Sequence, residues 1–141
     1  LKGKRLISAN DFFHGLFETE LKSDEIITNI KYPKIINNDL LFFEEIVRRH
    51  GDYAMAGIMG FIKKNDKQIS DIKLVFFGTG DKPNIASETS KHLITNNYEY
   101  EVIKKILKSD IDFTSDINSS SEMKAHLSAI LIEKMFSGFK K

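Results

Sequence analysis

The chain has 141 residues, enough for one core of ordinary size and too few for two comfortable ones. Its 21 Lys and Arg against 20 Asp and Glu leave a net charge of +1, which argues against nucleic-acid binding through a surplus of cations. The lack of cysteine excludes disulfides, thiolate nucleophiles and iron–sulfur clusters ligated within the chain. No apolar run approaches the roughly 18 residues that a membrane helix needs, so we expect a soluble cytoplasmic protein.

The first 32 residues are predicted to contain isolated elements. We expect a strand over residues 1–7 and a strand over residues 25–32 that Pro33 ends. Between them we expect a short helical turn, capped by Asn10 or Asp11, that runs through Phe12, Phe13 and Leu16 with its aromatic residues in the core. A lone edge strand is only marginally stable in water.

From Pro33 onward the pattern changes to three successive strands. After a turn at residues 37–39, strands are predicted over residues 40–47, 56–63 and 69–77, and residues 65–68 form a hairpin loop between the last two. In the third strand, Ile72, Leu74 and Phe76 alternate on one face. Short polar connections between successive strands indicate an antiparallel sheet.

Three helices are expected after the strands. The first covers residues 84–94, the second residues 98–107, and a polar loop over residues 110–120 leads to the third. Ser119 and Glu122 have the spacing of a capping box at its start, and Gly138 ends it. Strands followed by helices predict an α+β fold in which a three- to four-stranded antiparallel sheet packs on a layer of about three helices.

Few residues suggest catalysis by this chain alone. The four histidines (His14, His50, His92 and His126) lie in separate segments without metal-ligand spacing. Glu44 and Glu45 are adjacent on a predicted strand and therefore point to opposite faces. No serine lies in a Gly-x-Ser-x-Gly elbow. These patterns disfavour a metal centre, a glycosidase pair and a serine nucleophile.

The stretch Arg48–Gly57 is the first candidate site. Gly51 permits a sharp turn, Asp52 is a good N-cap for a helical turn, and Tyr53 offers an apolar ring with a polar tip. The small residues that follow allow another backbone or a flat ligand to approach. The alternative is a strand end with solvated arginines and a core tyrosine, and these residues alone favour that alternative.

The stretch Gly78–Pro83 is the second candidate, because it lies where a strand is expected to give way to a helix. Loops that bind phosphate occur at such junctions. The sequence lacks the third glycine of a dinucleotide fingerprint and the Gly-Lys-Ser/Thr ending of a nucleoside triphosphate loop. An ordinary turn is therefore the favoured interpretation of this stretch taken by itself.

Three motifs in order resemble a known family. Phe-Phe-x-Gly-x-x-x-Thr at residues 12–19, Arg-x-x-Gly-Asp-Tyr-Ala at residues 48–54 and Gly-x-Gly-Asp-x-Pro at residues 78–83 resemble the C-terminal part of the flavin-binding medium subunit of molybdenum hydroxylases. This is the carbon monoxide dehydrogenase and xanthine dehydrogenase family. The resemblance implies that residues 1–32 are the remnant of the FAD-binding lobe with its connector, and that residues 33–141 are the C-terminal α+β domain.

The resemblance also implies a function. It places Tyr53 against the isoalloxazine ring of FAD, with Gly51 and Asp52 aiming it, and Lys82 as a cation near the flavin. Glycine-rich loops of an N-terminal FAD-binding lobe hold most of the cofactor. The implied partners are an iron–sulfur small subunit and a large subunit with the molybdenum cofactor, in an oxidoreductase where this chain is not catalytic alone. The alternative is a non-catalytic α+β binding or oligomerisation module.

Overall fold

The computed structural model describes residues 3–36, 39–65 and 68–138. The chain divides into two compact units, Leu1–Ile35 and Ile36–Lys141. The predicted turn at residues 37–39 and the predicted hairpin loop at residues 65–68 each include two residues outside the described ranges.

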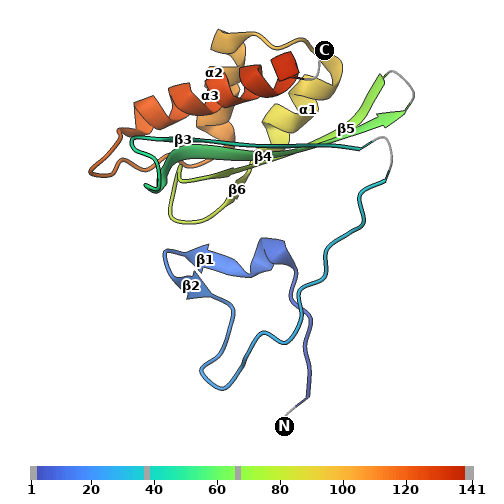
Figure 1. Ribbon diagram of the computed structural model, residues 1–141, viewed down its shortest axis with the longest axis vertical. Helices are drawn as coiled ribbons and strands as arrows, with labels where there is room; N and C mark the ends of the chain where they lie inside the picture. Colours follow the sequence, from blue (N-terminus) through green and yellow to red (C-terminus); the bar gives the residue numbers. More distant parts are fainter. Residues whose placement is uncertain (1–2, 37–38, 66–67, 139–141) are drawn as a thin grey trace. The chain divides into compact units, whose positions relative to one another are not determined.

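The first unit contains one short helical turn and one small hairpin. The 3₁₀ turn η1 spans Ala9–Asp11 and is followed by strands β1 (Phe13–Gly15) and β2 (Glu18–Thr19), which pair antiparallel (Figure 1). The predicted helical turn is therefore wrong beyond Asp11, and the Ser8 side chain, which accepts from the Asn10 amide, caps the turn.

The two longer strands predicted for this unit are also wrong for the residues described. Residues 3–8 and 25–32 belong to no strand, and residues 1–2 lie outside the described part. The backbone N–H and C=O groups of a strand must pair with a neighbouring strand. An alternating pattern of side chains does not show whether such a neighbour exists. The expectation of core aromatics fails as well, because Phe13 is exposed and no described residue of 3–36 is fully buried.

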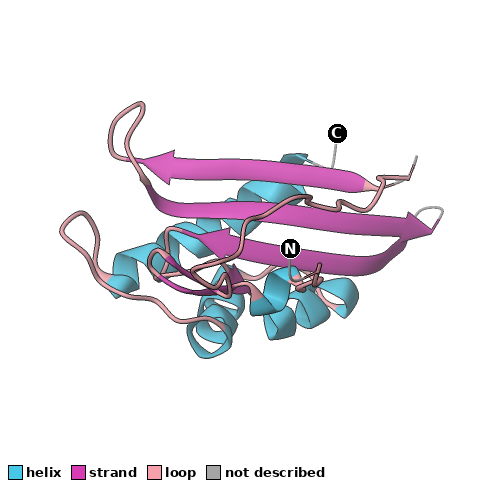
Figure 2. Ribbon diagram, turned by 90° about the horizontal axis from the view of Figure 1, so that it is seen from below, coloured by secondary structure: helices cyan, strands magenta, loops and turns pink. Residues whose placement is uncertain are grey.

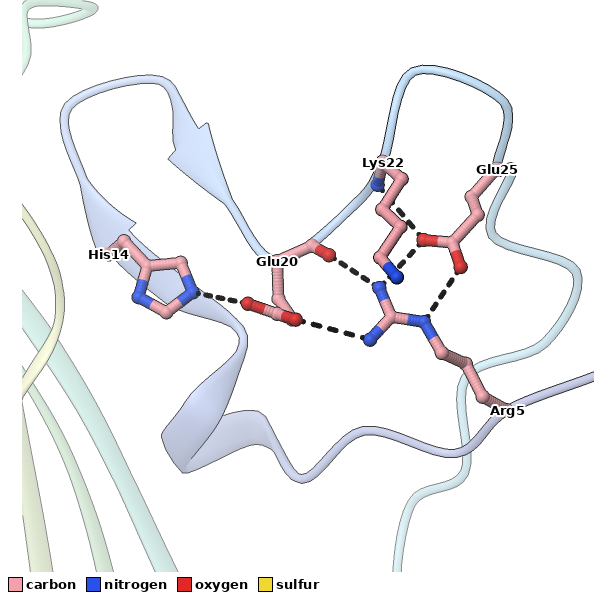
Figure 3. A network of polar contacts seen from close by, with 5 residues as sticks. All are labelled: Arg5, His14, Glu20, Lys22 and Glu25. Carbon is pink, nitrogen blue, oxygen red and sulfur yellow. Dashed lines mark hydrogen bonds and ion pairs between the residues drawn. The ribbon is translucent and has the colours of Figure 1, made fainter.

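Polar contacts around Arg5 connect the segments of this unit. The Arg5 guanidinium donates to both carboxylate oxygens of Glu25, at 2.7 and 2.6 Å, and to the carboxylate of Glu20 at 3.2 Å (Figure 3). The Glu25 carboxylate also accepts from the Lys22 amide at 2.9 Å, and His14 lies 3.0 Å from Glu20. The Arg5 hydrogen bonds, followed by that amide, lower the pKa of Glu25 to about 2.

The second unit contains a four-stranded antiparallel sheet in the order β3-β4-β5-β6. Its strands are β3 (Leu40–Val47), β4 (Ala54–Asn65), β5 (Gln68–Phe77) and β6 (Asn84–Ile85). The first three confirm the predicted strands. The fourth was expected to begin a helix, but its two residues pair with Val75 and Phe76 instead.

Three helices cover one face of this sheet (Figures 1 and 2). They are α1 (Ser87–Thr95), α2 (Tyr100–Asp110) and α3 (Ser121–Gly138). Every second residue of the central strands points into the core beneath them, because side chains alternate along a strand. The largest side chains that are completely or almost completely buried are Phe76, Ile58, Ile62, Leu74, Ile103, Leu107, Leu131, Ile132 and Met135. The predicted α+β fold is confirmed. Within the described residues, no helix is both long and apolar enough to cross a membrane.

Helix α3 begins one residue later than the predicted capping box requires. The Ser120 hydroxyl accepts from the Met123 amide at 3.2 Å, so Ser120 and not Ser119 is the N-cap. Glu122 then falls too early to complete a box. Its carboxylate instead pairs with Lys104 at 2.6 Å and with Lys108, which ties α3 to α2.

We expect Ser120→Ala to lower the free energy of unfolding by about 1 kcal/mol, because an amide at the helix start loses its acceptor. Ser119→Ala is the matched control, since the Ser119 hydroxyl makes only a 3.4 Å bond to the Ser120 carbonyl. Urea unfolding followed by circular dichroism measures both. A larger loss for Ser119→Ala contradicts this assignment of the cap.

Candidate flavin-facing site

The candidate stretch after β3 forms a hairpin turn and not the expected helical turn. The Asp52 amide donates to the Arg49 carbonyl at 3.0 Å, and Gly51, at the third position of the turn, has a φ of +88°. Glycine adopts this left-handed conformation without steric cost. Asp52 closes the turn through its backbone, and its carboxylate lies 4.0 Å from Arg48, so its predicted role as a helix cap is wrong.

Tyr53 is displayed at the end of this turn. Its side chain is 95% exposed, so the alternative of a core tyrosine is wrong. The next residue, Ala54, begins β4. A large amphipathic ring next to the first residue of a central strand presents contact area to a partner or ligand, at little cost in conformational entropy.

The second candidate stretch lies beside the first. Because β3, β4 and β5 pair antiparallel, the end of β3, the start of β4 and the end of β5 lie at the same end of the sheet (Figure 1). Gly78 has a φ of +73°, and a Cβ atom built on it lies 2.4 Å from the Ala54 carbonyl oxygen. The two loops are therefore in direct backbone contact, which their separation in the sequence does not reveal.

The loop after β5 is anchored in the protein and does not form a phosphate cradle. Thr79 is fully buried, and its carbonyl accepts from the Thr114 amide at 2.9 Å. Strand β6 separates this loop from α1, so no helix begins at its end. The interpretation as a phosphate-binding junction is wrong. Lys82 remains exposed, and its carbonyl accepts from the Asn84 side chain at 3.0 Å.

The small residues after Tyr53 accommodate protein neighbours. Ala56 is fully buried in the core. The ring of Phe77 lies over Gly57, where a Cβ atom would meet ring carbons at 2.1 Å, and it stacks on Phe43 with ring centroids 5.6 Å apart. A flat ligand therefore does not occupy the space at Gly57. The register that pairs Gly57 with Phe77 created this contact, and no local sequence signal predicts it.

The histidines do not form a metal centre. Among the described residues, no three His, Cys, Asp or Glu side chains are grouped as metal ligands. His126 of α3 instead has its Nδ1 atom 2.6 Å from the Tyr100 hydroxyl of α2, a contact between helices.

These residues fit one part of a flavin and not another. Tyr53 offers an exposed aromatic face and Lys82 an exposed cation, two features that suit a flat, electron-rich ring. The pyrophosphate of FAD requires amides that converge at a helix start or a glycine-rich loop, whereas Gly78 and Thr79 are already packed against their own domain. The residues therefore suit contact with the flavin ring and do not suit binding of the pyrophosphate.

The sequence of this chain matches a family model and several known proteins. Residues 42–138 match the family model described as the CO dehydrogenase flavoprotein C-terminal domain. The glyceraldehyde dehydrogenase medium chain of Sulfolobus acidocaldarius is 34% identical over 95% of this chain and 48% of its own length. The nicotine 6-hydroxylase medium subunit of Paenarthrobacter nicotinovorans is 30% identical over the same shares of the two chains. The chain thus spans about half the length of these relatives.

A solved structure shows the same fold. The reconstituted CO dehydrogenase from Oligotropha carboxidovorans superposes with a TM-score of 0.82, at 18% identity, over 92% of this chain and 46% of the other. The matched relatives are subunits of oxidoreductases. The chain belongs to the family of CO dehydrogenase flavoprotein C-terminal domains, as the three motifs predicted.

Proposed function

We propose that this chain is the C-terminal part of the FAD-containing medium subunit of a molybdenum hydroxylase, in which Tyr53 covers one side of the flavin ring. The observation that carries the proposal is the 95% exposed side chain of Tyr53 on a glycine turn, beside a second loop, in a domain of this flavoprotein family. A tyrosine held at the end of such a turn offers a flat apolar face with a polar tip for packing against another ring.

The chain's own residues have positioning roles in this proposal. Gly51 and the Asp52 amide fix the turn that aims Tyr53, and Tyr53 excludes water from the ring by packing. Lys82 supplies positive charge beside the electron-rich ring. FAD itself supplies the transfer of electrons between partners. No residue of this chain is assigned a catalytic role.

The proposal also assigns partners. An N-terminal FAD-binding lobe holds the pyrophosphate, because the described residues do not provide that grip. An iron–sulfur small subunit and a large subunit with the molybdenum cofactor complete the electron path to an external acceptor. The names of the relatives, "medium chain" and "medium subunit", support an assembly of several chains.

Substitution of Tyr53 in the flavin-containing complex tests the site. We expect Tyr53→Ala to change the flavin fluorescence and to raise the dissociation constant of FAD roughly fivefold, the loss of about 1 kcal/mol of aromatic contact. Tyr53→Phe retains the ring and should preserve both properties. Val102→Ala, on an exposed part of α2, is the control.

Two results contradict the proposal. A complex purified through this chain that contains no flavin contradicts the function. Unchanged fluorescence, redox potential and acceptor rates for Tyr53→Ala in a complex that does contain flavin contradict the assignment of Tyr53.

A further inference from the structure

A buried charge lies in helix α3. The Lys124 side chain is only 3% exposed, and its ammonium lies 2.7 Å from a carboxylate oxygen of Asp116, in the loop that joins α2 to α3. A buried ammonium costs free energy that a partner must offset, and replacing such a pair with apolar residues is often neutral for stability. The contacts of Asp116 show what the pair fixes in place.

Asp116 fixes the α2–α3 loop, which comprises residues 111–120. Its second carboxylate oxygen accepts from the amides of Asn118 and Ser119, at 2.7 and 2.9 Å, and its own amide donates to the Ser119 carbonyl at 2.9 Å. Because Lys124 belongs to a helix, it holds this carboxylate, and with it the turn, in place against α3. The loop is thus fixed at the end where it enters the helix.

Another part of the same loop contacts the second candidate stretch. The Thr114 amide donates to the Thr79 carbonyl at 2.9 Å, and a Cβ atom built on Gly80 lies 3.2 Å from the Asp112 carbonyl oxygen. Within the described residues, the buried Thr79 hydroxyl has no hydrogen-bond partner, so this residue is held through its backbone. The α2–α3 loop therefore supports the stretch Gly78–Pro83.

These contacts form a continuous path from α3 to the candidate flavin-facing site. Gly78 approaches the carbonyl of Ala54, the residue that follows Tyr53, and Lys82 lies in the same stretch as Gly78. Figures 1 and 2 show the α2–α3 loop at the same end of the sheet as the turn between β3 and β4. A displacement of Asp116 would pass along this chain of packed backbone groups to both candidate residues of the site.

We infer that Lys124 and Asp116 are positioning residues for the flavin-facing site, and that they set the place of Lys82 and of the Tyr53 turn through the α2–α3 loop. The inference rests on the proposed function and adds two residues, outside the three motifs, that keep the site in one geometry. Neither residue contacts the flavin in this assignment. Their contribution is preorganisation, because loops already held in their bound conformation lose less entropy when a ligand packs on them.

Hydrogen exchange in the flavin-containing complex, purified through a tag on this chain, tests this path. The variants are Asp116→Asn and Lys124→Met, which both remove the ion pair. Glu122→Gln is the matched control, because it removes the other ion pairs of the same helix turn, with Lys104 and Lys108, that do not involve the α2–α3 loop. Mass spectrometry of this chain's peptides gives the exchange rates.

We expect peptides that cover residues 76–83 and 111–120 to exchange at least about fivefold faster in both variants, because these loops are no longer held. The control should leave their rates unchanged. Residues 69–75 of β5 should keep their rates in every variant. A general loss of stability would speed exchange in β5 as well, so this pattern separates positioning from destabilisation.

The flavin gives a second readout. In Asp116→Asn and Lys124→Met we expect its fluorescence to change in the direction that Tyr53→Ala produces. The dissociation constant of FAD should rise roughly twofold, less than for Tyr53→Ala, because the aromatic ring is still present and only its preorganisation is lost. Glu122→Gln should preserve both properties.

Four outcomes overturn the inference or separate it from the proposed function. Unchanged exchange over residues 76–83 in both variants contradicts the positioning role and leaves the proposed function standing. Faster exchange in β5 as well contradicts that role in the same way. Faster exchange in the loops with unchanged flavin fluorescence and affinity contradicts a role toward the flavin. A complex without flavin contradicts the proposed function, and its exchange pattern still decides whether the ion pair holds the loops.

Discussion

We expect Gly78→Ala to lower the free energy of unfolding by about 3 kcal/mol, because two costs combine at this position. The φ of +73° is unfavourable for alanine, and the added Cβ atom lies 2.4 Å from the Ala54 carbonyl oxygen. The carbonyl belongs to the first residue of β4 and cannot move without disturbing the central strand. Urea unfolding of the chain measures the change.

Gly51→Ala separates these two costs. Gly51 has a φ of +88°, but nothing lies within 4 Å of the position that an added Cβ atom would take. We therefore expect a loss of about 1 kcal/mol, from the backbone conformation alone. Equal losses for Gly51→Ala and Gly78→Ala would show that the approach of Gly78 to Ala54 adds no cost, and that the two loops are not held in contact.

We expect Asp116→Ala to cost about 2 kcal/mol, because it leaves a buried cation without a partner. Lys124 is only 3% exposed, and its ammonium lies 2.7 Å from the Asp116 carboxylate. Asp116 is 44% exposed, which places the effect below that of a fully buried pair. Lys124→Met is the matched variant, and it should cost less because it removes the charge instead of leaving it unpaired.

The same pair predicts how stability depends on pH. The hydrogen bond from Lys124, then those from the Asn118 and Ser119 amides, hold the pKa of Asp116 below its ordinary value. A lowered folded-state pKa means that the contribution is present above about pH 4, the ordinary range of an aspartate, and is lost as pH falls through the lowered pKa. The difference in stability between the natural chain and Asp116→Asn should therefore shrink in acid. A difference that stays constant from about pH 7 to about pH 3 contradicts this role of Asp116.

Elements with strong local periodicity could be predicted from the sequence. The alternation of Ile72, Leu74 and Phe76 defined β5, and the apolar repeat before Gly138 defined α3, because both signals lie within one element. The strand expected over residues 25–32 failed because a strand also depends on a partner. The predicted N-cap of α3, Ser119, was one position too early, because Ser119 and Ser120 have the same side chain and only the structure shows that Ser120 accepts the amide.

The candidate site shows the same limit. The motif drew attention to Tyr53 and Gly51, and the structure places both in an exposed turn. The contact between Ala54 and Gly78, and the cover of Gly57 by Phe77, follow from the register of β4 against β5. Register is a long-range property, so single-residue chemistry allowed another backbone or a flat ligand at the position where a phenyl ring of the same domain lies.

The length of β4 places its two ends far apart. The strand has 12 residues, from Ala54 beside the tyrosine turn to Asn65. At about 3.3 Å per residue, such a strand is roughly 35 Å long. A fluorophore or an affinity tag attached at the Asn65 end would therefore lie far from the turn that carries Tyr53. Probes attached there can report on assembly without contacting that turn.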